Sequence, residues 1–163
     1  MPSLTLFNRQ RKRRVDMSEF RTFAESAIVK VTKLKTAAVL PEEVNVIFVS
    51  DARIAAIHRK YMSVDAPTDV ITFGHGEIVI SVETAERQAK TFDSSFEHEL
   101  RLYCVHGLLH LAGFDDLTDA GFKRMAKLQE RIVAQAVASV SASASEGNSD
   151  STESAVRAEL QRS

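Results

Sequence analysis

An apolar segment with two histidines one helical turn apart constrains this 163-residue chain more than any other feature. The segment reads LYCVHGLLHLAGFDD, at residues 102–116, and places His106 four positions before His110. A four-residue step along an α-helix returns to nearly the same face, so both imidazoles point in one direction. Gly113 follows the last apolar positions, where glycine commonly ends a helix because it accepts the left-handed conformation. The segment therefore predicts a largely buried helix with two neighbouring histidines.

Two aspartates follow the predicted helix end, and the turn can bring one of them back toward the histidines. Two imidazole nitrogens and one carboxylate oxygen form a three-ligand site for zinc or a similar divalent ion, with one coordination position open. Histidine pairs also occur in ordinary cores, but two buried imidazoles without a partner are costly. Gly107, beside His106, would leave room for the close approach of another backbone or a substrate. Together these features favour a metal site.

The cysteine and the other histidines do not fit this site. Cys104 lies two residues before His106, about 200° around the helix, so we interpret it as a small buried hydrophobe. His58 and His98 have no comparable spacing. His75 lies in a predicted turn, where it is either a surface residue or a residue that overhangs the site.

Composition limits the cellular setting that we expect for the chain. A single cysteine excludes an internal disulfide and fits a reducing compartment. No apolar run approaches the roughly 18–20 residues of a membrane span, and the basic residues near the N-terminus follow the apolar ones, unlike a secretory signal. We therefore expect a cytoplasmic protein with no membrane partner. A net charge of −1 also means that any affinity for nucleic acid must come from a local patch.

The strand and helix patterns mix without a strict βαβ alternation, which predicts an α+β fold with a single small mixed sheet of about four strands covered by helices. The metal site would lie at the end of a central helix. We expect strands at 3–8, 44–49, 69–73 and 78–80, the last two forming a hairpin. We expect helices at 18–34, 51–61, 82–90, 97–111 and after Thr118.

We predict a single catalytic domain over residues 1–137 and a disordered Ser/Ala-rich tail over 138–163. The tail has too little apolar bulk to offset the entropy of ordering it. A dense basic cluster lies near the other end of the chain, and it is either a solvated turn or a phosphate-contacting patch. The cluster comprises Arg9, Arg11, Lys12, Arg13 and Arg14.

Three motifs of the chain resemble those of one known family. HGLLHLAGFDD resembles the HGxLHLxGYDH signature of the YbeY-type endoribonucleases, the bacterial rRNA-maturation factors. DAPTDVITF, at 65–73, resembles that family's D-x-P-T-D/N-V-L/I-S/T-F segment. GEIVISVETAERQA, at 76–89, is similar to its segment beginning G-D/E-I-x-I-S. The three motifs occur in the family's order and spacing, so the resemblance covers about residues 44–135.

The resemblance implies a zinc-dependent, single-strand-specific endoribonuclease. Its roles would be maturation of the 16S rRNA 3′ end and ribosome quality control, with the rRNA precursor and the ribosome or its proteins as partners. His106 and His110 match the first two zinc ligands. The third ligand falls on Asp116, where the common pattern has histidine, and aspartate is a competent substitute. Asp115 is the alternative third ligand.

The chain departs from the family pattern at a position that matters for RNA binding. The family usually carries an arginine there, thought to serve the RNA phosphate, and this chain has Met62. Arg59 and Lys60 lie within one turn and are candidates to supply the charge. Thr68 and Asp69 match the family's cleft-lining pair, although they are equally compatible with a strand-opening turn.

Three functions are consistent with the sequence. The first is the metal-dependent endoribonuclease, in which a metal-bound water of lowered pKa could act as the nucleophile. The second is a ribosome-assembly or RNA-binding factor whose metal mainly holds the fold, which the loss of the arginine favours. The third is a metal-dependent hydrolase of another substrate. The zinc-protease motif HExxH places a glutamate general base where this chain has Gly107, which argues against peptide hydrolysis.

Overall fold

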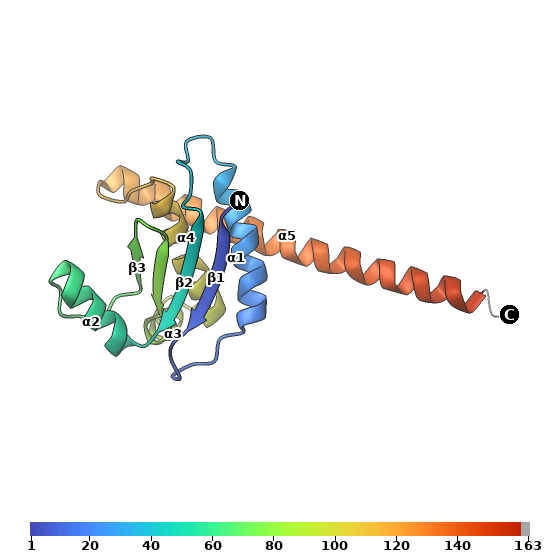
Figure 1. Cartoon of the computed structure of the whole chain (residues 1–163), viewed down its shortest axis with the longest axis horizontal. Coiled ribbons are helices and arrows are strands. Elements are labelled where there is room, and N and C mark those ends of the chain that lie inside the picture. The colour runs from blue at the N-terminus through green and yellow to red at the C-terminus, as the bar shows by residue number, and fades with distance from the viewer. Residues whose placement is uncertain (161–163) are drawn as a thin grey trace.

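Four strands form one mixed sheet at the centre of the fold (Figure 1). The computed structural model describes residues 1–160, and the side chains of residues 1–145. The strands are β1 (Ser3–Asn8), β2 (Glu43–Val49), β3 (Val70–Phe73) and β4 (Glu77–Ser81), in the order β1-β2-β4-β3. β2 is parallel to β1 and β4, whereas β3 and β4 form the predicted antiparallel hairpin. The α+β prediction with a four-stranded mixed sheet is confirmed.

Five helices surround the sheet, and short polar side chains cap their first turns. They are α1 (Met17–Thr32), α2 (Asp51–Met62), α3 (Val82–Thr91), α4 (Phe96–Leu111) and α5 (Asp119–Leu160). Each cap side chain accepts a hydrogen bond from a backbone N–H of the first turn, which would otherwise lack a partner. The capping residues are Asp16, Ser50, Ser81, Ser95 and Thr118. No helix of the described part of the chain is long and apolar enough to cross a membrane.

The two faces of the sheet are covered unequally. Alternate residues of the central strands, such as Phe48 and Ile78, point toward α1 and α4 and form the main core. Their neighbours, such as Val49 and Val79, point to the other face and pack with Ile54 of α2 in a smaller cluster. The second face therefore depends mainly on α2 for its cover.

A charged network holds α2 in place against the start of α3. The Asp51 carboxylate accepts hydrogen bonds from Ser81 Oγ at 2.6 Å and Thr84 Oγ1 at 2.8 Å, and forms an ion pair with Arg87. Burial alone would raise the pKa of Asp51, but the hydrogen bonds from Arg87, Ser81 and Thr84 outweigh it and lower that pKa. The carboxylate is therefore ionised at neutral pH and fixes the N-terminal end of α2.

Gly107 lets α4 lie close to the sheet. A Cβ atom at this position would come within 2.7 Å of Ile78 Cγ2 and 2.9 Å of Ile78 Cδ1. The missing side chain therefore makes room for β4. Of the two alternatives for this glycine, the close approach of another backbone is therefore correct, and space for a substrate is not, because Ile78 already fills that space.

Helix α5 continues beyond the predicted end of the domain. The sequence predicts disorder over 138–163, whereas the structure has α5 helical as far as Leu160 and extending away from the sheet (Figure 1). Residues 161–163 of the predicted tail lie outside the described residues. Alanine has a high helix propensity, and a packed helix needs no new nucleus to extend. Among the described side chains of α5, Ala136 is the last that is fully buried, and residues 141–145 are exposed.

Removing residues 138–163 is expected to change the melting temperature by less than about 2 °C, which corresponds to a change of under ~1 kcal/mol in the free energy of unfolding. Among the described side chains, the buried ones that attach α5 to the core, such as Ile132 and Ala136, all precede the cut. Thermal unfolding of the full chain and of a chain ending at Val137 would measure the difference. A fall of about 5 °C or more would mean that the segment packs against the domain.

Candidate metal centre

The end of α4 and the loop after it bring three potential metal ligands together. The Nε2 atoms of His106 and His110 are 2.9 Å apart. Asp116 approaches both, with Oδ2 at 3.7 Å from His106 Nε2 and Oδ1 at 3.9 Å from His110 Nε2. One ligand atom from each residue lies within 4.8 Å of the other two. The three predicted metal-ligating residues thus converge on one point.

The backbone turn after α4 decides which aspartate faces the histidines. Gly113 has a φ of +90°, and the N–H of Phe114 donates to the Leu109 carbonyl at 3.0 Å, which closes the helix. The Asp115 carboxylate then accepts a hydrogen bond from the Leu117 N–H at 3.3 Å and stays within the turn. Asp116, the next residue, is the one directed back toward the helix end.

Each imidazole is held by an oxygen atom next to its Nδ1. His106 Nδ1 lies 2.9 Å from Oε1 of Gln129 in α5, and His110 Nδ1 lies 3.2 Å from the Phe114 carbonyl oxygen. Both oxygens accept hydrogen bonds, so each Nδ1 carries the ring proton and each Nε2 presents a lone pair. Two lone pairs at 2.9 Å repel one another unless a cation lies between them. The arrangement fits a divalent metal ion.

The distances also match those that a metal requires. A tetrahedral zinc with bonds of about 2.0–2.1 Å holds two nitrogens about 3.3 Å apart, so the histidines need only a small separation. Burial first, and then the proximity of His106, lower the pKa of His110, which favours the neutral imidazole that binds metals. The side chains of His106, His110 and Asp116 are 25%, 30% and 31% exposed, so the site is open to solvent.

The two histidines line a cleft of about 300 Å³ beside the β3 edge of the sheet. Its other walls come from β3, from the end of α2 and from the end of α4. The lining residues are Met62, Val70, Ile71, Thr72, Gly74, His106, His110 and Leu111. Met62, at the position where the resemblance implies an arginine, therefore lies at the histidine cleft.

The two basic candidates near Met62 do not line this cleft. Arg59 forms an exposed ion pair with Asp65 at 3.2 Å. Lys60 lies over the Tyr61 ring, with Nζ at 5.2 Å from the ring centroid, and lines a different cavity. Neither residue is placed to supply the missing charge at the histidines.

The two polar candidates also lie outside the residues that line the cleft. Thr68 Oγ1 donates to Asp69 Oδ1 at 3.3 Å, and the same oxygen accepts the Val70 N–H at 2.7 Å. The Asp69 carbonyl also accepts the Ser81 N–H at 3.0 Å. These contacts are typical of a turn that begins β3. They favour the strand-opening turn over a cleft-lining role for Thr68 and Asp69.

The remaining histidines have partners elsewhere. His58 Nδ1 lies 2.9 Å from the Ala66 carbonyl oxygen, and His98 lies 3.5 Å from a carboxylate oxygen of Glu130. Cys104 is buried, as predicted, and burial raises the pKa of its thiol to about 12. Sequence reasoning missed Gln129, since a polar residue on an exposed helix face carries no signal until packing places it beside His106.

The fold and the site together define a class: α+β proteins with a two-histidine, one-carboxylate centre of the kind that metal-dependent hydrolases use. The family model described as Endoribonuclease YbeY matches residues 5–137. The chain belongs to the YbeY endoribonuclease family.

Individual relatives agree with this assignment. A protein named Endoribonuclease YbeY from Desulfitobacterium hafniense is 39% identical over 111 residues, which cover 57% of this chain and 71% of the relative. One of the same name from Methylocella silvestris is 34% identical over 125 residues, covering 70% and 71%. The solution structure of a Thermotoga maritima protein superposes with a TM-score of 0.61 at 28% identity, covering 88% of this chain and 95% of that one.

Proposed function

We propose that this protein is a metal-dependent endoribonuclease that cleaves single-stranded RNA during rRNA maturation, including maturation of the 16S 3′ end. The convergence of His106, His110 and Asp116 at an open cleft, in a chain of the YbeY family, is the observation that carries the proposal. We further propose that it acts in the cytoplasm on rRNA precursors, in contact with the ribosome or its proteins.

We propose Zn²⁺ as the ion, with His106, His110 and Asp116 as its ligands. Imidazole nitrogens combined with a single carboxylate suit zinc better than magnesium or calcium, which prefer sites made of oxygen atoms. When bound, the ion would polarise a phosphoryl oxygen and lower the pKa of a water molecule. Gln129 and the Phe114 carbonyl fix the ring orientations, so both Nε2 atoms are presented without further rearrangement.

The cleft itself contributes little positive charge. Among its described lining residues none is a lysine or an arginine, and Met62 occupies one wall. The backbone phosphates must therefore be held by the metal and by basic residues outside this cleft.

Restoring the cation with Met62→Arg is expected to lower the KM for single-stranded RNA roughly tenfold, because a new charge-assisted hydrogen bond to phosphate would form beside the metal. Met62 is 48% exposed, so the longer side chain fits without disturbing the core. Steady-state cleavage of a labelled oligonucleotide would measure the change. Met62→Gln, which is polar but uncharged, is the matched control, and an equal gain in both variants would contradict the electrostatic explanation.

Removal of the metal tests the catalytic proposal. Treatment with a chelator is expected to stop cleavage of single-stranded RNA, and one equivalent of Zn²⁺ is expected to restore it, whereas a duplex of the same sequence should resist cleavage throughout. Protein that binds stoichiometric metal but cleaves no RNA would refute the proposal and support the assembly-factor function. Cleavage that persists after complete metal removal would refute the metal-dependent mechanism.

A further inference from the structure

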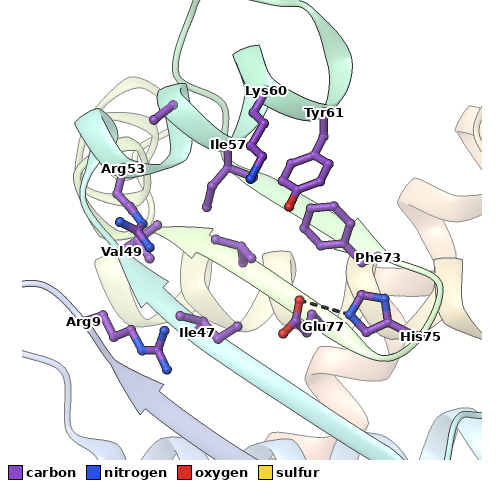
Figure 2. A pocket seen from close by; sticks show the side chains of 12 residues that line it. Arg9, Ile47, Val49, Arg53, Ile57, Lys60, Tyr61, Phe73, His75 and Glu77 are labelled. Atoms are coloured by element: carbon purple, nitrogen blue, oxygen red, sulfur yellow. Dashed lines mark ion pairs between the residues drawn. The ribbon is translucent and has the colours of Figure 1, made fainter.

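A second cleft lies on the face of the sheet that α2 covers (Figure 2). Its volume is about 440 Å³. Ile47 of β2 and Val79 of β4 form its apolar floor, and residues of α2 form one wall. The metal ligands face the other side of the sheet, so this cleft is separate from the metal centre.

Three basic side chains surround this second cleft. They are Arg9, which follows β1, and Arg53 and Lys60 of α2. Within the described residues none of the three forms an ion pair with a carboxylate. The one carboxylate in the cleft, Glu77, lies 3.1 Å from His75 Nε2. The cleft therefore carries a local excess of positive charge in a chain whose net charge is −1.

A row of aromatic rings lies at the other end of the cleft (Figure 2). The rings of Tyr61 and Phe73 have their centroids 5.2 Å apart, and those of Phe73 and His75 are 5.9 Å apart and nearly parallel, at 24°. Tyr61 is 59% exposed, and the His75 side chain is 68% exposed. Exposed aromatic rings beside cations that form no ion pair with a carboxylate are the two elements from which proteins build sites for single-stranded nucleic acid.

The two clefts share a wall. Along the edge strand β3, Thr72 lines the metal cleft and Phe73 lines the second one. The same alternation occurs at the end of α2, where Met62 faces the metal cleft and Tyr61 faces the second one. A flexible strand that leaves one cleft needs only to pass over the sheet edge at β3 to enter the other.

We propose that the second cleft binds unpaired nucleotides of an RNA strand, with bases stacked on Tyr61, Phe73 and His75 and phosphates held by Arg9, Arg53 and Lys60. That the same strand is cleaved at the metal centre rests on the nuclease function proposed above. The site would supply basic groups that the metal cleft lacks. It also gives Arg9, the first residue of the basic cluster, a phosphate-binding role.

Unpaired RNA fits these features better than other polyanions do. Stacking requires free base faces, which a duplex hides within its own stack. A free phosphate or a sulfated ligand would use the cations but leave the aromatic row without a partner. The inference thus predicts dependence on both groups together, and a preference for single strands over duplexes.

A double variant, Arg53→Ala with Tyr61→Ala, tests the proposal in the full-length protein. We expect the Kd for a ten-nucleotide single-stranded RNA to rise by roughly tenfold or more, because one stacking contact and one phosphate contact are lost. The slope of log K against log salt should also fall by about 0.7 for the one cation removed. Fluorescence anisotropy in the presence of a chelator measures binding without cleavage.

The matched control is Lys35→Ala with Phe92→Ala, which also removes one exposed cation and one exposed aromatic ring, both outside the two clefts. Its Kd should stay within about twofold of the wild-type value. Equal Kd values for the test and control variants would overturn the proposal. If the test variant does not fold, Arg53→Glu at an exposed position of α2 provides the same comparison.

The RNA-affinity measurement tests the second cleft independently of the RNA-cleavage assay that tests the metal centre. If the wild type cleaves no RNA but its RNA affinity still depends on Arg53 and Tyr61, the second cleft stands as an RNA site and the nuclease proposal fails. If the wild type cleaves RNA and its affinity is indifferent to these residues, the nuclease proposal stands and the second cleft is not an RNA site.

Discussion

Alanine at His110 or Asp116 is expected to reduce zinc affinity by at least about a hundredfold, while alanine at Asp115 leaves it largely unchanged. Loss of residues that merely support a metal ligand already costs about 10–100-fold, and loss of a ligand costs more. Asp116 lies 3.7 and 3.9 Å from the two Nε2 atoms, whereas Asp115 accepts a hydrogen bond from its own turn. RNA cleavage should fall together with the bound metal.

Metal content per chain after gel filtration, measured by atomic absorption, would test this expectation, and circular dichroism would confirm that each variant is folded. Asp115→Ala is the matched control because it removes the neighbouring carboxylate of the same loop. If Asp115→Ala lost the metal and Asp116→Ala kept it, the ligand assignment would be reversed. Retention of metal by all three variants would place the metal elsewhere in the protein.

Glutamate at position 107 is expected to prevent stable folding, even though it would complete the HExxH motif. A Cβ atom there would come within 2.7 Å of Ile78, so a longer side chain has no room between α4 and the sheet. Gly107→Ala should cost about 1–3 kcal/mol as an overpacked contact. A buried glutamate without a partner adds several kcal/mol, which is comparable with the roughly 5–15 kcal/mol that stabilises a typical domain.

Soluble yield and thermal unfolding of Gly107→Ala and Gly107→Glu would measure these effects. Gly74→Ala is the control, because a Cβ at that glycine meets no atom within 4 Å. Ile78→Ala removes all three atoms that the new Cβ would meet, so combining it with Gly107→Ala should cost less than the sum of the two single substitutions. A Gly107→Glu protein that unfolds near the wild-type temperature would mean that this residue faces solvent or the metal cleft instead of Ile78.

The sequence was informative wherever a local rule decides the structure. The helical spacing of His106 and His110 predicted their common direction, and Gly113 predicted the end of α4. Alternating apolar residues and a glycine-rich turn predicted the β3–β4 hairpin. Each of these signals acts over a few residues, so the rest of the chain does not need to be known.

Features that depend on contacts between distant residues could not be predicted in this way. Gln129 reaches His106 only because α5 packs against α4. The sequence left open whether Gly107 makes room for another backbone or for a substrate, and only the position of Ile78 decides between them. The second cleft combines Arg9 with residues of α2 and of the hairpin, which are far apart in the chain. The order of strands in the sheet brings them together, and no short motif encodes that order.

The proposed ligands all come from the short segment 106–116, and this spacing affects how the ion and the polypeptide depend on each other. An unfolded chain can also bring closely spaced ligands to an ion, because closing a short loop loses little entropy. Binding to the unfolded state offsets part of the stability that binding to the native state provides. Metal binding therefore adds little net stability to the folded chain. The ion can be exchanged or replaced while the sheet and its helices remain folded.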